Sequence, residues 1–441
     1  MLEPNTATLS PGNAEGSSPD HEMTTSAQVL DAFIERSWRS NAQRQRDKGV
    51  DFVIGRRDGV RLWDLEGRRS VIDCGTAGGV HSLGHRHPEV LESLRRALDE
   101  GRDTGLWAIP NAEYLKLQDS LAAHAPSPSL DRSVVTLCST LSVDVASMFA
   151  FRFTGRRVVA AYRHGYHGHT GFAAMVTGSH EEGVIAHYNL PTEHSRFFDR
   201  YGDLTELKAV LTPDVAALIL EPMNYETFEP AEASYLRGAE KLCREQGIIF
   251  IIDETRTGLG RSGRLWACEY SGVTPDMMVT GKGLSGGLYP ASAVLMRRDI
   301  YDRCMNEHRF AYISSLGGNE ISCLVAAKVL EVSARPETLS HAAHVGEILR
   351  ERLDEVCARH PTILTRAWGR GCVANVGLLP TVSGRALYKA VFDAGVLCHS
   401  VSEIDPPAIK FFPPIVITED DAGEIAAALD KAVTALASAA V

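Results

Sequence analysis

The chain lacks the features that would indicate a secreted, membrane-bound or nucleic-acid-binding protein. Its nine cysteines are odd in number and include no Cys-x-x-Cys pair, which argues against both a disulfide framework and a zinc cluster. No apolar run approaches the length of a membrane span, and the N-terminus has no basic-then-apolar signal pattern. The net charge of −11 argues against nucleic acid or an anionic membrane as a partner, since either favours a basic surface. We therefore expect a cytoplasmic protein without nucleic-acid or membrane partners.

The chain contains enough hydrophobic residues to form sizeable cores. Its 441 residues are 44% hydrophobic, which suits a large domain together with a smaller one. Residues 1–26 are an exception, because they are rich in Pro, Gly, Ser, Asn and acidic residues and show no apolar period. This composition predicts a disordered leader without a chemical role.

Beyond residue 75, apolar strand patterns alternate with helical patterns. The predicted strands are Val134–Leu137, Val158–Tyr162, Ala216–Leu220, Ile248–Ile252, Met277–Thr280 and Ala293–Met296. Such alternation is typical of an α/β sheet with helices on both faces. After Asn319 the pattern is mainly helical, with one further strand predicted at Val373–Leu378.

Two charged residues follow strand patterns at places where ligands bind. The apolar, β-branched run from Gly247 predicts a strand that is buried on both faces and ends at Asp253. The next predicted strand ends just before Lys282, whose neighbours Gly281 and Gly283 leave room for a planar ligand. Ligands of open α/β sheets bind at the carboxyl ends of strands. Because a lysine can form a Schiff base with pyridoxal 5′-phosphate (PLP) and a carboxylate can keep its pyridine nitrogen protonated, Lys282 and Asp253 are the predicted catalytic residues of a PLP site.

The motifs around these two residues resemble those of a known family. They are Asp253-Glu-Thr-Arg-Thr-Gly-Leu-Gly-Arg-Ser-Gly263, Thr274-Pro-Asp276 and Gly281-Lys-Gly-Leu-Ser-Gly-Gly-Leu-Tyr-Pro290. Together they resemble class III aminotransferases of the ornithine and omega type, and further agreement extends from about Val60 to Thr418. The resemblance implies an α/β protein of PLP fold type I, with a large domain whose mostly parallel sheet is flanked by helices and a smaller α+β domain.

The resemblance also implies a division of the chain and a dimer. Residues 27–75 would join the small domain, residues 76–318 would form the large PLP-binding domain, and residues 319–441 would form the small C-terminal domain. The family takes one phosphate contact from the partner subunit, through a residue just before Gly-Gly-Asn. Ser315 occupies that position here. A homodimer or higher homo-oligomer with shared active sites is therefore expected.

The cofactor phosphate is expected where a strand turns into a helix, because free backbone N–H groups and the positive end of the helix dipole meet there. The segment that begins at Ser139 lies at such a junction. The family usually shows Ser-Gly-Thr-Glu, so Ser139 matches while Thr140 and Leu141 depart, and Leu141 removes a hydroxyl donor. We assign all three to the phosphate site. Ser142 either compensates for the lost hydroxyl or caps the helix.

Three more residues are assigned to the cofactor from the resemblance. Tyr166 matches the aromatic residue that stacks on the PLP ring in related enzymes. His167 either flanks the ring or is a hydrogen-bonded loop residue, and Glu221 belongs to the Glu-Pro motif of the family. The histidines around Tyr166 have no standard zinc spacing and no accompanying cysteine or carboxylate, so no metal is expected.

Substrate recognition is where the chain departs most from the family. Ornithine-type enzymes hold a substrate carboxylate with an arginine before the Pro-Pro pair, but Lys410 stands there, a point charge instead of a bidentate fork. Arg256 replaces a residue that is often Gln or Met, and it lies near the phenolic oxygen of the ring, binds an anionic substrate, or forms a surface ion pair. Glu226 aligns with a glutamate that in ornithine aminotransferases helps to switch between substrates.

Three hypotheses for the function follow. The first is an aminotransferase-like enzyme that acts on an amino acid or amine through the Lys282 Schiff base and a quinonoid intermediate. The second keeps PLP but not transamination: an aminomutase, or an enzyme for elimination, replacement or carbon–carbon bond formation on a larger anionic amino acid. The third is a non-catalytic scaffold, against which Lys282 and Asp253 argue.

Overall fold

The computed structural model describes residues 25–102, 109–178, 189–308, 311–402 and 407–439. The predicted leader, residues 1–26, lies outside these ranges except for its last two residues. Thr25 is the N-cap of helix α1, and its side chain accepts a hydrogen bond from the backbone N–H of Gln28, while Ser26 is the first helical residue. Helix α1 (Ser26–Arg36) therefore begins at the last residue of the predicted leader.

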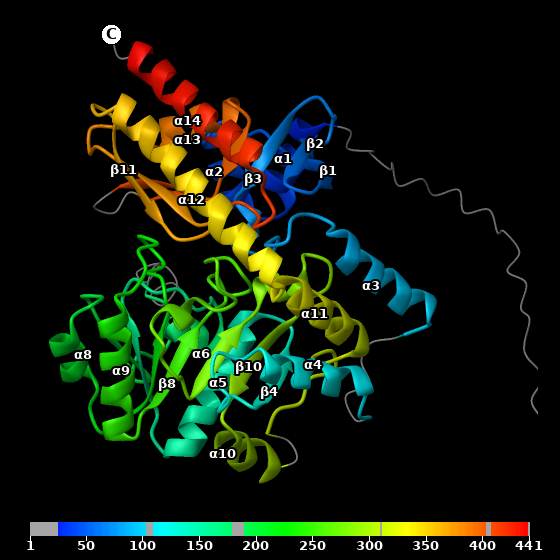
Figure 1. The fold of residues 1–441 in the computed structure, drawn as a ribbon, viewed down its shortest axis with the longest axis vertical. Helices are drawn as coiled ribbons and strands as arrows, with labels where there is room; N and C mark the ends of the chain where they lie inside the picture. The colour runs from blue at the N-terminus through cyan, green and yellow to red at the C-terminus, as the bar shows by residue number, and fades with distance from the viewer. Residues whose placement is uncertain (1–24, 103–108, 179–188, 309–310, 403–406, 440–441) are drawn as a thin grey trace, which may run out of the picture.

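A seven-stranded sheet forms the centre of the lower part of the molecule in Figure 1. Its strand order is β4 (Arg132–Thr136), β10 (Ser292–Met296), β9 (Met277–Thr280), β8 (Ile249–Asp253), β7 (Val215–Leu220), β5 (Val158–Tyr162) and β6 (Ser195–Phe198). The pairs from β9 to β6 are parallel, whereas β10 is antiparallel to both of its neighbours. The mostly parallel sheet predicted from the sequence is confirmed, and β6 is a strand that the sequence did not indicate.

Both faces of this sheet are buried, which explains its continuous apolar strands. In β8, Ile249 and Ile251 belong to one core cluster, while Phe250 and Ile252 belong to another, because successive side chains point to opposite faces. The helices beside the sheet are α3 (Pro88–Asp99), α4 (Ala112–Ala123), α5 (Ser139–Thr154), α6 (Gly171–Met175), α8 (Leu204–Val210), α9 (Ala233–Gln246), α10 (Arg298–Tyr301) and α11 (Glu320–Ser333). Short helical turns complete this part at η1 (Thr76–Gly78), η2 (Ala267–Tyr270), η3 (Lys282–Ser285) and η4 (Asp302–Asn306).

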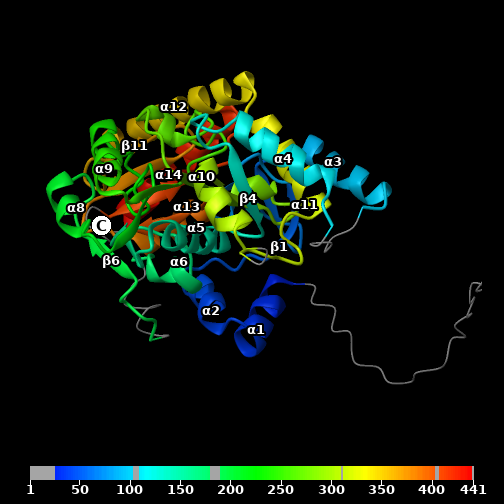
Figure 2. The same cartoon turned by 90° about the horizontal axis from the view of Figure 1, so that it is seen from below.

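The upper part of Figure 1 contains two four-stranded sheets. One is antiparallel, in the order β11 (Leu364–Gly369), β12 (Ala374–Leu378), β15 (Ala408–Phe411) and β14 (Ser400–Ser402). The other has the order β1 (Ile54–Asp58), β2 (Arg61–Asp64), β3 (Ser70–Cys74) and β13 (Val396–Cys398). The helices of this part are α1 (Ser26–Arg36), α2 (Arg39–Asp47), α12 (Pro336–Arg359), α13 (Gly384–Asp393) and α14 (Glu419–Ala439). Figure 2 shows α1 and α2 projecting from the rest of the molecule.

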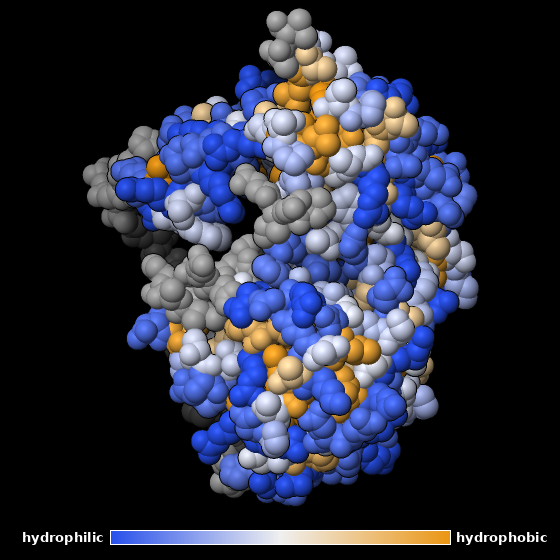
Figure 3. All heavy atoms as spheres, turned by 90° about the vertical axis from the view of Figure 1, so that its left-hand side faces the viewer, coloured by the Kyte–Doolittle hydropathy of each residue, from blue (hydrophilic) through white to orange (hydrophobic). Residues whose placement is uncertain are grey.

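The chain passes between the upper and lower parts at two places, between β3 and α3 and between α11 and α12. Because β13 from the C-terminal region pairs with β3 from the N-terminal region, the two ends of the chain build one sheet. Helix α11 packs against α3 and α4 beside the large sheet. Figure 3 shows a hollow between the two parts on one face.

Parallel pairing places the predicted site residues at one edge. Strand β8 ends at Asp253, and its parallel neighbour β9 ends at Thr280, two residues before Lys282. Both strands thus deliver a functional side chain to the same edge of the sheet. In the described part of the chain, no helix is both long and apolar enough to cross a membrane.

Candidate active site

Lys282 lies at the start of η3 in a backbone conformation that few side chains adopt. Its φ is +43°, in the left-handed region, which is a form of local strain that clusters at functional sites. A cavity of about 260 Å³ surrounds it. Desolvation and the nearby Arg256 guanidinium lower the pKa of Lys282 to about 7. The amine is therefore an available nucleophile at neutral pH.

Seven residues that we assigned to the site from the sequence line this one cavity. They are Ser139, Thr140, Tyr166, His167, Asp253, Arg256 and Lys282. The segments that carry them are far apart in the sequence, and the sheet edge brings them together. Among the described residues, no group of three or more His, Cys, Asp or Glu side chains is arranged to hold a metal ion.

Asp253 and His167 form a buried pair. His167 Nδ1 lies 2.8 Å from Asp253 Oδ2, and the two side chains are 1% and 3% exposed. Burial alone would raise the pKa of Asp253, but the hydrogen bond and the charge of His167 outweigh it and hold the pKa below its usual value. Burial opposes the charged form of His167 as well, yet Asp253 raises the pKa of the imidazole. His167 is therefore hydrogen-bonded to Asp253 and also lines the cavity, so neither of our two interpretations is excluded.

Glu221 lies near the Asp253–His167 pair but is not among the residues that line the cavity. It accepts a hydrogen bond from the backbone N–H of Tyr166 over 3.2 Å. Burial raises the pKa of Glu221 to about 7, against the opposing charges of His167 and Arg256. This contact fixes the loop that carries both Tyr166 and His167, so Glu221 acts on the site through its neighbours.

The N-terminus of α5 forms the opposite wall of the cavity. A β-carbon added at Gly281 would lie 2.2 Å from Ser139 Oγ, and one at Gly168 would lie 2.5 Å from Thr140 Oγ1, so these hydroxyls fill space that the glycines leave. Ser142 is neither a helix cap nor a phosphate donor, since its buried Oγ bonds Thr136 and Ser292 and the N-cap position is Cys138. Leu141 does not line the cavity.

Tyr166 faces the cavity next to a second aromatic ring. Its ring stacks on that of Tyr225 at a centroid distance of 5.0 Å and an angle of 19°. The Lys282 ammonium nitrogen lies 5.6 Å from the centre of the Tyr166 ring. A flat ligand beside Lys282 would therefore meet a flat aromatic face.

Lys410 and Glu226 lie beyond the cavity, behind Tyr225. Burial and the charge of Arg256 lower the pKa of Lys410 to about 7, while Glu226 opposes this. Glu226 Oε2 lies 3.2 Å from His164 Nδ1. Burial raises the pKa of Glu226, and His164 and Lys410 both counteract this shift.

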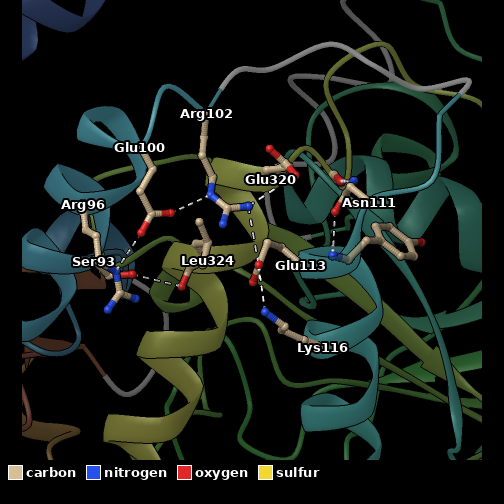
Figure 4. Close-up of polar contacts among 11 residues, drawn as sticks. Ser93, Arg96, Glu100, Arg102, Asn111, Glu113, Lys116, Glu320 and Leu324 are labelled. Carbon is tan, nitrogen blue, oxygen red and sulfur yellow. Dashed lines mark hydrogen bonds and ion pairs between the residues drawn. The ribbon is translucent and has the colours of Figure 1, made fainter.

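Ser315 lies away from the Lys282 cavity. It is exposed and lines a separate cavity of about 340 Å³, together with Asn111, Tyr114 and Asn319. Polar contacts hold this segment to the large domain, since Asn111 Nδ2 donates to Gly318 O over 3.0 Å and Glu320 accepts from Arg102 (Figure 4). Within one chain, Ser315 does not meet Lys282.

Sequence reasoning missed residues at the back of the site. His399, which follows β13, and Phe412, which follows β15, have ring centres 5.5 Å apart. Desolvation and then the charges of Arg256 and Lys282 lower the pKa of His399. Neither residue belongs to a sequence motif with its own chemistry. The Pro-Pro pair after Phe412 is the sequence feature nearest to that residue.

These residues fit PLP. The first turn of α5 offers backbone N–H groups for a phosphate, and the hydroxyl-bearing Ser139 and Thr140 line the cavity beside it. Asp253 is an ionised carboxylate that can hold a pyridinium proton, and Lys282 offers a free amine.

The fold and this arrangement define a PLP-dependent enzyme of fold type I. A family model described as aminotransferase class III matches residues 42–433, and the chain belongs to that family. It is 34% identical to an uncharacterized aminotransferase of Archaeoglobus fulgidus over 90% of this chain and 91% of that protein. It is 30% identical to an ornithine aminotransferase of Bacillus cereus over 84% and 91% of the two chains.

A solved structure of an ornithine aminotransferase has the same fold. The ornithine aminotransferase of Toxoplasma gondii superposes with a TM-score of 0.83 at 25% identity, covering 95% of this chain and 97% of the other. A second structure of that enzyme contains PLP at partial occupancy in its active site. The comparisons confirm the predicted family, fold, cofactor and enzyme class, and they do not favour the aminomutase and related alternatives.

Proposed function

We propose that this enzyme transfers the amino group of an amino acid or amine, with Lys282 and Asp253 as its catalytic residues. The observation that carries the proposal is the lysine amine with a pKa of about 7 in the same cavity as the buried, ionised Asp253. When bound, PLP supplies an aldehyde that reacts with amines and a ring that withdraws electrons from the reacting carbon.

Lys282 has two tasks in this proposal. Its unprotonated amine holds the cofactor until the substrate amine takes its place. The released amine then moves a proton between the substrate carbon and C4′ of the cofactor, and a pKa near neutrality suits a group that must both accept and donate. Asp253, which lines the same cavity, is instead paired with His167.

The remaining residues of the site hold and orient the cofactor in this proposal. Ser139, Thr140 and the first backbone N–H groups of α5 bind the phosphate, and Leu141 adds only its backbone. Tyr166 would pack against the ring and Asp253 would keep the ring nitrogen protonated, while His167 keeps Asp253 ionised and in place. Glu221 positions the Tyr166 loop.

The active unit is proposed to be a homodimer. Ser315 is exposed, and it lies among exposed apolar side chains, with Ile313 40%, Leu316 46% and Ile109 62% exposed. Such a patch supports burial against a second chain. The partner's copy of this segment would then supply Ser315 to the phosphate site. We further propose a cytoplasmic location, which is supported by nine cysteines that are all unpaired, eight of them buried.

The test of the proposed reaction is a half-reaction without an amino acceptor. Purified holoenzyme is incubated with candidate amino acids and amines, and pyridoxamine phosphate is measured by chromatography. We expect one equivalent to form with a substrate and none with the Lys282→Ala variant. Turnover of an amino acid without any pyridoxamine phosphate would contradict transamination.

A further inference from the structure

Arg256 is a buried cation with unused hydrogen-bonding capacity. Its side chain lines the Lys282 cavity and is 5% exposed. Nη1 makes only a long 3.5 Å contact with Tyr225 O, and the buried Nη2 has no partner among the described residues. A guanidinium presents five donors in a fixed fork, so leaving part of the fork unpaired in a buried site is costly unless a ligand completes it.

The acidic groups nearby do not neutralise Arg256. Asp253 is paired with His167 at 2.8 Å, and no described carboxylate lies within ion-pair distance of the Arg256 guanidinium. Glu221 is close enough for Arg256 to lower its pKa, but its hydrogen bond comes from the Tyr166 backbone. The surface ion pair that was one of our three interpretations of Arg256 is therefore wrong.

The walls around Arg256 orient its fork. The guanidinium carbon lies 4.2 Å from the centre of the Tyr225 ring and 4.3 Å from that of the Phe228 ring. Cation–π interactions with these two rings hold the guanidinium plane in position. Lys410 approaches the same two rings, at 6.0 Å and 5.0 Å, and adds a second basic side chain. The result is a positively charged wall with an aromatic lining next to the reacting lysine.

From this arrangement we propose that Arg256 binds the carboxylate of the substrate, so that the enzyme acts on aminocarboxylates and discriminates against simple amines. This inference rests on the proposed aminotransferase function and narrows its substrate class. A carboxylate accepts two parallel N–H bonds from a guanidinium, which is the bonding that Arg256 lacks. Lys410, at the position where ornithine-type relatives have the arginine, supports the negative charge from behind the aromatic rings.

The test compares substrate pairs that differ only in the carboxylate: L-ornithine with 1,4-diaminobutane, L-lysine with 1,5-diaminopentane and L-alanine with ethylamine. Arg256→Gln should raise KM for the amino acid about 10- to 100-fold more than KM for the amine of the pair, the value of a lost charge-assisted bond, because any effect through the pKa of Lys282 is common to both substrates. Arg256→Lys should fall between, because it keeps the charge and loses the fork. Arg264→Gln, outside the cavity, is the matched control.

A binding measurement makes the test independent of turnover and of the proposed reaction. Succinate, glutarate and propionate are titrated into the holoenzyme by calorimetry; wild type and Arg264→Gln should bind one of them, and Arg256→Gln should bind it about 10- to 100-fold more weakly. Carboxylate binding that Arg256→Gln leaves intact, or no carboxylate binding by wild type, would overturn the inference. So would an Arg256→Gln variant whose only defect is weaker PLP binding or a shifted cofactor spectrum, because Arg256 would then serve the cofactor. Carboxylate binding through Arg256 without pyridoxamine phosphate formation would instead refute only the proposed reaction.

Discussion

At the residue scale, the site consists of titratable groups whose pKa values move in opposite directions. Lys282 loses its proton more easily than an exposed lysine does, because burial and Arg256 both disfavour its charge. Asp253 stays ionised despite burial, because His167 bonds it. Motifs predicted Lys282 and Asp253, since strand ends and flanking glycines are visible in a sequence. The pairing of Asp253 with His167 was left open, because loop conformation decides which atoms meet.

The lowered pKa of Lys282 predicts how the apoprotein captures PLP. The rate of capture should rise with pH, reach half its maximum near pH 7 and then level off, because the fraction of free amine saturates there. An ordinary exposed lysine would continue to gain rate up to about pH 10. Stopped-flow absorbance over this range measures the profile, with Lys282→Ala as the control. A rate that still rises steeply above pH 9 would show that the amine is not desolvated.

The Asp253–His167 pair predicts a separation of binding from catalysis. Asp253→Asn should bind PLP, because the phosphate and Lys282 contacts remain, but should lose about 100-fold or more in kcat, since the ring nitrogen loses its anionic partner. His167→Asn should lose less activity and shift the acid limb of the pH–rate profile upward, because Asp253 then loses the group that lowers its pKa. Near-normal turnover of Asp253→Asn would mean that another group protonates the ring.

At the scale of elements, the cavity depends on glycines that allow strand β9 to approach helix α5. The predicted strands matched the large sheet closely because both faces are buried and their apolar runs are continuous. Ser142 was interpreted as a phosphate donor or as a helix cap. Both interpretations were wrong, because its hydroxyl points inward and bonds Thr136 and Ser292. A sequence pattern cannot show which way a hydroxyl at a helix start will turn.

A methyl group at Gly281 tests this packing. A β-carbon there would lie 2.2 Å from Ser139 Oγ and 2.5 Å from Ser292 Oγ, so Gly281→Ala should lower the free energy of unfolding by about 1–3 kcal/mol and weaken PLP binding. Gly423→Ala in α14 is the control, since its new methyl meets only the end of the Arg352 side chain. Thermal melts and PLP titrations measure both effects, and equal stability of the two variants would count against the close approach.

At the scale of the whole molecule, the fold joins the two ends of the chain in one small domain beside the large sheet. The family resemblance predicted this organisation, but composition could not have shown that β3 and β13 pair or that α11 packs against α3 and α4. Such pairings depend on contacts between segments hundreds of residues apart. The predicted homodimer belongs to this scale too, because Ser315 and Lys282 lie in different cavities of one chain.

A shared site predicts complementation between two inactive variants. Lys282→Ala chains lack the lysine but can lend Ser315, and Ser315→Glu chains keep the lysine but place a negative charge beside the neighbour's phosphate. Each variant alone should be inactive, while mixed dimers should regain one of the two sites. Refolding or co-expression followed by an activity assay gives the result. Fully active monomers in sedimentation, or inactive mixed dimers, would argue against the shared site.

The central claim is that the cavity at the edge of the large sheet holds PLP on Lys282. Reduction of the holoenzyme with borohydride, digestion and mass spectrometry of the peptides test it directly. We predict one pyridoxyl group per chain, on Lys282, and none in the Lys282→Ala variant. A pyridoxyl group on another lysine, or a Lys282→Ala protein that still traps the cofactor, would contradict the claim.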